Sequence, residues 1–149
     1  MGLFDAIDIA GSGLTAERLR MDVTAENLAN AQTTRAADGG PYHRKEVVLQ
    51  QAGGSTFATM LTGAIGGVRA AQEPRGVEVA AIVEDQTAER LVYDPSHPDA
   101  DANGYVAMPN VNPVTEMVDL ISASRAYEMN VTAMQAAKQN FVKTLELLR

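Results

Sequence analysis

The sequence predicts an α+β protein in which long N- and C-terminal helices pair as an antiparallel coiled coil, with a small β-rich module between them. Apolar residues recur every seven positions near both ends of the 149-residue chain, which predicts the two helices. Short alternating runs separated by turn residues fill the middle and predict the module. We therefore expect three parts: residues 1–35 and 113–149 as the helices of one coiled-coil domain, and residues 36–112 as the module.

The C-terminal segment carries the more regular of the two heptad patterns. No glycine or proline follows Pro113, and Asn112 before it is a good helix cap because its side chain can accept a free backbone N–H. An apolar seam at this period is typical of a helix that lies along another helix. The seam positions are Leu120, Tyr127, Met134, Phe141 and Leu148.

The N-terminal segment repeats the pattern. Its seam positions are Ile7, Leu14, Met21 and Leu28. Gly11 and Gly13 weaken a helix by roughly 1 kcal/mol each relative to alanine, so a break or bend near Ser12 is an option. The helix should end between residues 30 and 34. Two seams at opposite ends favour pairing with each other; the alternative is a small bundle, against which the middle offers no further helix.

Three asparagines lie near the seams: Asn27, Asn30 and Asn130. A polar residue in an apolar seam can fix the register and the choice of partner at some cost in stability. The alternatives are that Asn30 is simply a residue at the helix C-terminus and that Asn130 is solvated. We expect the register role most strongly for Asn130.

The middle of the chain predicts short strands and turns. Expected strands are residues 42–50, 68–71, 76–85, 89–93 and 105–108. In the third of these, Val77, Val79, Ala81 and Val83 should share one face. Glycines among small residues predict a flexible loop at residues 52–67.

Composition excludes several classes of function. The net charge is −7 and no basic patch exists, so a nucleic-acid partner is not expected. Cysteine is absent, which excludes a disulfide framework and a cysteine nucleophile. No apolar stretch is long enough to insert into a membrane, and the N-terminus lacks the pattern of a cleaved signal peptide. Two isolated histidines give no catalytic constellation, so we expect no enzyme activity and no cofactor.

One motif suggests a metal site. Residues 99–104 match the first half of a calcium-binding EF-hand loop, with oxygen ligands at Asp99, Asp101 and Asn103 and a glycine at the sixth position. The twelfth position should be a glutamate and is Asn110 instead. We therefore favour a polar turn whose side chains bond their own backbone, and expect no metal.

Longer motifs resemble a known family. Residues 12–23 and 25–34 are similar to the N-terminal motif of the bacterial flagellar rod, hook and axial proteins, although Glu26 stands where that family often has asparagine. Residues 39–48, 92–112 and 116–131 narrow the resemblance to the proximal-rod proteins of the flagellar basal body. It covers most of the chain except residues 51–75.

The resemblance implies a structural subunit that assembles helically, with copies of itself and other rod proteins, into the periplasmic drive shaft and export channel used in motility. It also implies contact with the basal-body adapter protein, passage through the flagellar type III export apparatus, and paired terminal helices in the inner layer. Alternatives are another rod- or hook-type axial protein and, far behind, a calcium-binding module.

Overall fold

The computed structural model describes residues 3–36, 39–53 and 75–147. Within these residues it contains two helices and two antiparallel sheets of two strands each, so the predicted α+β class is confirmed. The expected strand at 68–71 and nearly all of the expected loop at 52–67 lie outside the described residues.

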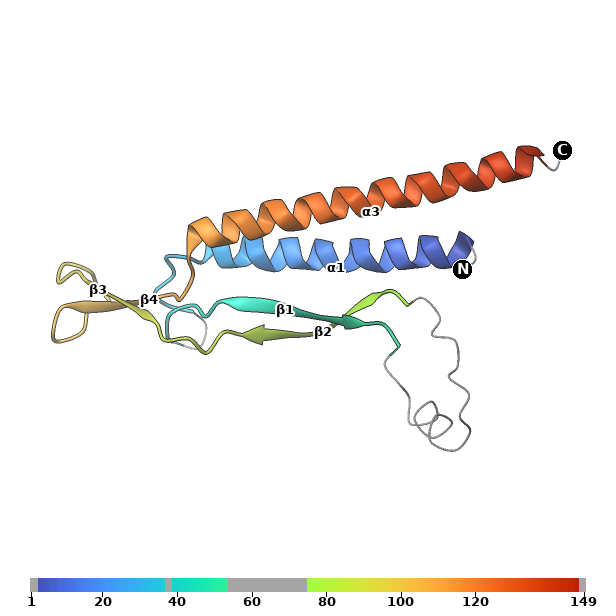
Figure 1. Ribbon diagram of the computed structural model, residues 1–149. Coiled ribbons are helices and arrows are strands. Elements are labelled where there is room, and N and C mark those ends of the chain that lie inside the picture. Colours follow the sequence, from blue (N-terminus) through green and yellow to red (C-terminus); the bar gives the residue numbers. More distant parts are fainter. Residues whose placement is uncertain (1–2, 37–38, 54–74, 148–149) are drawn as a thin grey trace, which may run out of the picture.

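Two long helices from the two ends of the chain lie side by side. Helix α1 spans Leu3–Ala29 and α3 spans Pro113–Leu147, and they run in opposite directions (Figure 1). The pairing register follows from two contacts, because Gly11 lies opposite Met134 and Asn27 bonds Glu116. The described chain therefore brings its two terminal helices together in antiparallel order.

The start of α3 forms as the sequence predicts, whereas α1 lacks the interruption that its glycines suggested. The Asn112 Oδ1 atom accepts the Val114 N–H at 3.0 Å, which confirms the predicted cap of α3. The break considered near Ser12 is absent, since α1 is continuous from Leu3 to Ala29. The Ser12 hydroxyl donates to the Ile9 carbonyl at 2.8 Å inside the helix.

The first sheet is a ribbon of β1, Lys45–Gln51, and β2, Val77–Glu84. Its register shifts between Val48 and Leu49, which pair with Ala81 and Val79. This bulge changes the alternation along β2, because cross-strand partners share a face and the extra residue moves the strand by one position. The prediction that Val77, Val79, Ala81 and Val83 share one face is therefore wrong.

The second sheet is a hairpin of β3, Arg90–Tyr93, and β4, Tyr105–Met108. The turn that connects these strands is the polar turn that the sequence pattern favours over a calcium-binding loop. In it the Asp101 Oδ1 atom accepts the N–H groups of Asn103 and Tyr105, both at 2.8 Å. In the described part of the chain no three His, Asp or Glu side chains gather closely enough to hold a metal.

The elements form layers. Helix α1 lies between α3 and the β1–β2 ribbon, while the β3–β4 hairpin projects past the end where α1 stops and α3 starts (Figure 1). A small apolar cluster of Ala31, Tyr42 and Val111 closes that end. Neither described helix is apolar enough over its length to cross a membrane.

Candidate functional site: a polar junction between helices and ribbon

A buried and hydrogen-bonded cluster of polar side chains lies where α1, α3 and the start of β1 meet. Asn27 and Glu116 are each only 1% exposed, although both are polar. Buried polar groups are costly unless their hydrogen bonds are made, so the partners of these two side chains decide how this junction is held. We call the set Asn27, Tyr42, Arg44, Lys45 and Glu116 the polar junction.

Asn27 makes four hydrogen bonds and uses both ends of its amide. Its Nδ2 group donates to the Lys45 carbonyl at 2.8 Å and to Glu116 Oε2 at 3.0 Å. Its Oδ1 atom accepts the Tyr42 hydroxyl at 2.8 Å and the Lys45 N–H at 2.9 Å. One side chain of α1 therefore holds the start of β1 and the first turn of α3.

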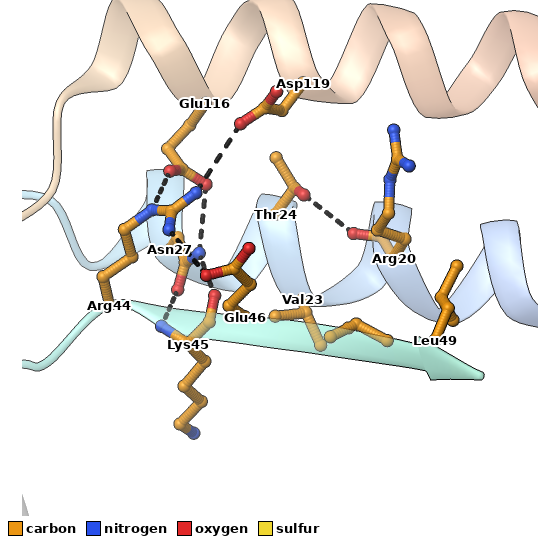
Figure 2. A pocket seen from close by; sticks show the side chains of 11 residues that line it. Arg20, Val23, Thr24, Asn27, Arg44, Lys45, Glu46, Leu49, Glu116 and Asp119 are labelled. Carbon is orange, nitrogen blue, oxygen red and sulfur yellow. Dashed lines mark hydrogen bonds and ion pairs between the residues drawn. The ribbon is translucent and has the colours of Figure 1, made fainter. Parts of the chain in front are cut away.

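Arg44 completes the junction from the other side. Its Nε group donates to Glu116 Oε1 at 2.6 Å, and its terminal nitrogens lie 3.6 Å from the carboxylates of Glu46 and Asp119 (Figure 2). Hydrogen bonds to charged groups are the stronger ones, and Glu116 is the buried centre of this set. The ion pair links residues 72 positions apart in the sequence.

The junction shifts the ionisation of two of its members. Burial, together with the carboxylates of Glu26, Glu116 and Glu84, raises the pKa of Tyr42 to about 12. The hydrogen bond to Glu116 raises the pKa of Arg44 above its ordinary value. Both shifts favour the proton-bearing forms that donate into the junction.

A cleft of about 340 Å³ opens beside the junction and is lined by parts of all three elements. The polar atoms at its floor already bond one another, as the drawn contacts of Asn27, Arg44 and Glu116 show (Figure 2). The arrangement is therefore suited to fixing the angle between the helix pair and the ribbon.

A second contact between the helices lies nearer the middle of α1, at Gly11 and Gly13. A Cβ atom on Gly13 would lie 2.9 Å from Asn130 Nδ2 and 3.2 Å from its Cγ, so the Asn130 side chain occupies the space that a side chain at position 13 would need. At Gly11 the nearest atom is Met134 Cε, at an ordinary 3.8 Å. Gly13 thus makes room for the side chain of Asn130.

The predicted seam residues are less deeply buried than several smaller residues of the same helices. All those within the described residues are half-buried except Phe141, which is 39% exposed, while Leu148 lies outside the described residues. The half-buried ones are Ile7, Leu14, Met21, Leu28, Leu120, Tyr127 and Met134. Smaller side chains are more deeply buried, among them Ala10, Ala16, Val23 and Ala123. Small residues are therefore among the most deeply buried apolar positions of both helices.

The three asparagines have different surroundings. Asn27 belongs to the polar junction, and Asn130 lies half-buried against Gly13. Asn30 bonds locally: its Nδ2 group donates to the Glu26 carbonyl at 2.9 Å, and its Oδ1 atom accepts the Thr33 hydroxyl at 3.1 Å. Those bonds are the ones expected of a residue at a helix C-terminus.

Sequence reasoning missed the pairing of Arg44 with Glu116. An acidic residue in the first turn of a helix is ordinarily explained by its favourable interaction with the helix dipole. Glu116 therefore gave no reason to expect a buried ion pair. One signal was available in the sequence. Glu116 lies four residues before Leu120 and seven before Ala123, so it falls on the same face of α3 as these apolar residues. A charged side chain in an apolar stripe calls for a buried partner.

A second polar contact holds the hairpin turn to the segment after α1. Asp99 accepts a bond from the Thr34 hydroxyl at 2.8 Å and forms an ion pair with Arg35 at 2.6 Å. The Thr34 bond, followed by the charges of Arg35 and His97, keeps the pKa of Asp99 below its ordinary value. The first acid of the supposed calcium loop therefore has protein partners.

Comparisons with known proteins agree at both ends of the chain. Residues 7–36 match the family model described as "Flagella basal body rod protein", and residues 102–147 match "Flagellar basal body rod FlgEFG protein C-terminal".

Several proteins that are similar to this chain over nearly its whole length share the same name. The chain is 48% identical to the flagellar basal-body rod protein FlgC of Bacillus subtilis, with 99% of each chain covered. It is 44% identical to the proteins of that name from Borreliella burgdorferi, with 100% of this chain and 99% of the relative covered, and from Salmonella typhimurium, with 99% and 98% covered. These matches indicate rod proteins and no catalytic family.

Proposed function

The chain belongs to the family of flagellar basal-body rod proteins named FlgC and is a structural subunit of the basal-body rod; from this premise we propose how its parts serve the rod. We propose that α1 and α3 form an antiparallel coiled coil in the inner layer of the rod. We further propose that residues 36–112 form a separate outer module and that the polar junction joins the two.

The contact between the helices supports the coiled-coil proposal. Ala16 of α1 and Ala123 of α3 are almost completely buried, and the predicted seam residues within the described chain are half-buried apart from Phe141. A seam of this kind tolerates no charge, because a buried unpaired charge is costly. The seam residues, together with Asn130 as the register-setting residue, would then determine which surface each subunit leaves for its neighbours.

The polar junction supports a mechanical role. In this proposal the rod transmits torque, and the outer module keeps a fixed orientation relative to the helices. Hydrogen bonds depend on direction, so the junction of Asn27, Arg44 and Glu116 would fix an angle that apolar packing alone leaves adjustable. Glu116 bonds both other side chains and is the observation that carries this proposal.

The proposal includes assembly partners. Membership of the family implies assembly with other flagellar rod proteins. We propose further that the chain contacts copies of itself and the basal-body adapter protein, that it passes through the flagellar type III export apparatus, and that it works in the periplasmic part of the rod without catalysis. A calcium-binding role has no support, because Asp99 and Asp101 bond within the protein.

A charge in the seam tests the coiled-coil proposal. Met134→Asp would place a carboxylate against α1 at Gly11, whereas Met129→Asp, on the same helix and 65% exposed, would not. We expect Met134→Asp to abolish swimming and to remove the subunit from purified basal bodies, with Met129→Asp less affected. Normal swimming with Met134→Asp would overturn the proposal.

A further inference from the structure

The start of β2 makes a contact with α1 that lies outside the polar junction. The Ser12 hydroxyl accepts the Val77 N–H at 3.0 Å while it donates to the Ile9 carbonyl at 2.8 Å. One hydroxyl group does both because it carries one proton and two acceptor lone pairs. The first residue of β2 is therefore bonded to a side chain that precedes it by 65 positions in the sequence.

Gly76 allows β2 to come this close to the helix. A Cβ atom on Gly76 would overlap the Ser12 Oγ atom and would lie 2.9 Å from Ser12 Cβ, closer than real Cβ atoms come to other atoms. The backbone of Gly76 is not in the left-handed region, so space and not conformation requires glycine here. We call Ser12, Gly76 and Val77 the ribbon anchor.

At the polar junction, the outer edge of β1 is bonded to α1. The Arg44 carbonyl accepts the Asp85 N–H at 2.7 Å, so the backbone groups of Arg44 face the partner strand. Successive residues of a strand alternate in this respect, which turns the N–H and carbonyl of Lys45 away from β2. Both of these Lys45 groups bond the amide of Asn27.

At the ribbon anchor, the outer edge of β2 is bonded to α1 instead. The Gly76 carbonyl accepts the Ala52 N–H at 2.9 Å and so faces β1, which turns the Val77 N–H away from β1 and toward Ser12. Two-stranded ribbons twist strongly, and the bulge in this ribbon adds to the twist. Opposite edges of the ribbon therefore face the same helix at its two ends.

The spacing of the two contacts on α1 matches the length of the ribbon. Ser12 and Asn27 are fifteen residues apart, which is about 22 Å along a helix. From Val77 to Glu84, the cross-strand partner of Lys45, β2 advances by seven residues, which is about 23 Å along a strand. Figure 1 shows the ribbon lying along α1 over this length. Both contacts therefore form together without stretching either element.

We propose that the ribbon anchor and the polar junction together prevent the β1–β2 ribbon from rolling on α1, with Ser12 as a positioning residue. A ribbon bonded at one edge is free to turn about that edge. Directional bonds on both edges, about 22 Å apart, oppose rotation in either sense. This inference rests on the proposed function and deepens it, because the ribbon belongs to the module whose orientation the polar junction is proposed to fix.

The absence of cysteine permits a disulfide test of the ribbon anchor, with Ser12→Cys and Gly76→Cys combined. A disulfide holds its Cβ atoms about 3.5–4.5 Å apart, so the 2.9 Å of this pair requires a small displacement. We expect the bond to form within one subunit, both in the purified full-length chain and in basal-body fractions. Alkylation followed by mass spectrometry counts the thiols that remain.

Arg18→Cys with Gly76→Cys is the matched control. Arg18 is exposed on the same helix, six residues beyond Ser12 and about 9 Å further along the axis. A disulfide spans at most about 7 Å between Cα atoms, so this pair should retain both thiols.

A distance measurement tests the positioning role of Ser12 itself. Spin labels on Arg18→Cys and Gln51→Cys, which are exposed positions of α1 and β1, report the distance between helix and ribbon in the full-length chain. We expect Ser12→Ala to broaden the distribution of this distance. Labels on Arg18→Cys and Met129→Cys report the distance between the two helices, which Ser12→Ala should leave unchanged.

Four results would overturn the inference. Two concern the disulfide: its absence from subunits that carry Ser12→Cys and Gly76→Cys, and its equal formation in the Arg18→Cys control. The other two are an unchanged helix-to-ribbon distribution in Ser12→Ala and equal broadening of the helix-to-helix distribution, which would indicate general loosening of the fold. Absence of the unmodified protein from basal bodies would instead refute the proposed function and leave the measurements on the purified chain standing.

Discussion

Two parts of the α1–α3 contact are formed by opposite means. Near the end of α1, Asn27 and Glu116 are buried and hydrogen-bonded; nearer its middle, Gly13 contributes no side chain and Asn130 occupies the space. Substitution in the first part leaves partners unsatisfied, whereas substitution in the second overfills the contact. The same helix pair should therefore respond to mutation by two separable mechanisms.

The largest effect is expected at Glu116. Glu116→Leu removes the acceptor of Arg44 and of the Asn27 amide, and loss of one partner of a buried pair typically costs about 3–5 kcal/mol. Because 22% of the Arg44 side chain is exposed and water can reach it, we expect the lower end, about 3 kcal/mol. Urea unfolding followed by circular dichroism measures this loss in the free energy of unfolding.

Asp119→Asn is the matched control for Glu116→Leu. Asp119 also faces Arg44, at 3.6 Å, but is half-exposed, so its removal should cost no more than about 1 kcal/mol. Equal losses for the two variants would show that burial of Glu116 does not determine the strength of the junction.

The next effect separates the two glycines. Gly13→Leu should lower the free energy of unfolding by about 1–3 kcal/mol through overpacking against Asn130. Gly11→Ala has ordinary contact distances and should raise it by up to about 1 kcal/mol through helix propensity, while Gly13→Ala should not.

A double-mutant cycle tests whether Asn130 is the cause. With Asn130→Ala the space opposite Gly13 is open, so Gly13→Ala should then stabilise by up to about 1 kcal/mol, as at Gly11. Additive effects of Gly13→Ala and Asn130→Ala would contradict close approach as the reason for the glycine.

Much of the fold follows from the sequence because periodicity is a local signal. The heptads predict both helices and their mutual packing, and Asn112 predicts the start of α3. The face pattern of β2 could not be predicted, since a bulge depends on the partner strand, which is distant in sequence.

The polar junction shows the limit more clearly. Arg44 and Glu116 are each unremarkable in their own segments, and only the tertiary fold places them together. Likewise Gly13 is unfavourable for a helix by local propensity and becomes suitable only when Asn130 lies opposite. Local rules fail at these positions because long-range packing decides them.

Tyr42 sharpens the description of the junction. Tyr42→Phe removes one hydrogen bond to Asn27 Oδ1, which still accepts the Lys45 N–H, so the expected loss near neutral pH is about 1 kcal/mol. The folded-state pKa of about 12 exceeds the ordinary value of 10.0. The unfolded chain therefore releases this proton first, and stability decreases as pH rises from 10 to 12.

Unfolding measured from about pH 9 to about pH 12 should show that decrease more steeply in the unmodified protein than in Tyr42→Phe. The stability advantage of the unmodified protein should therefore narrow as pH rises through this window. Parallel profiles would show that the junction does not hold the Tyr42 hydroxyl in its neutral form.

The smallest effect is expected at Asp99. Its ion-pair partner Arg35 is an exposed side chain that lies outside the contact between the helices. Its folded-state pKa lies below the ordinary value of 3.8, so its contribution is present above that value and is lost as pH falls through the lowered pKa. Asp99→Asn should therefore lose this small contribution at about pH 7, and its stability should then fall less than that of the unmodified protein below about pH 4. Acid unfolding that is as steep in Asp99→Asn as in the unmodified protein would contradict this, whereas a shallower curve would show that the hairpin is held by a contact independent of the polar junction.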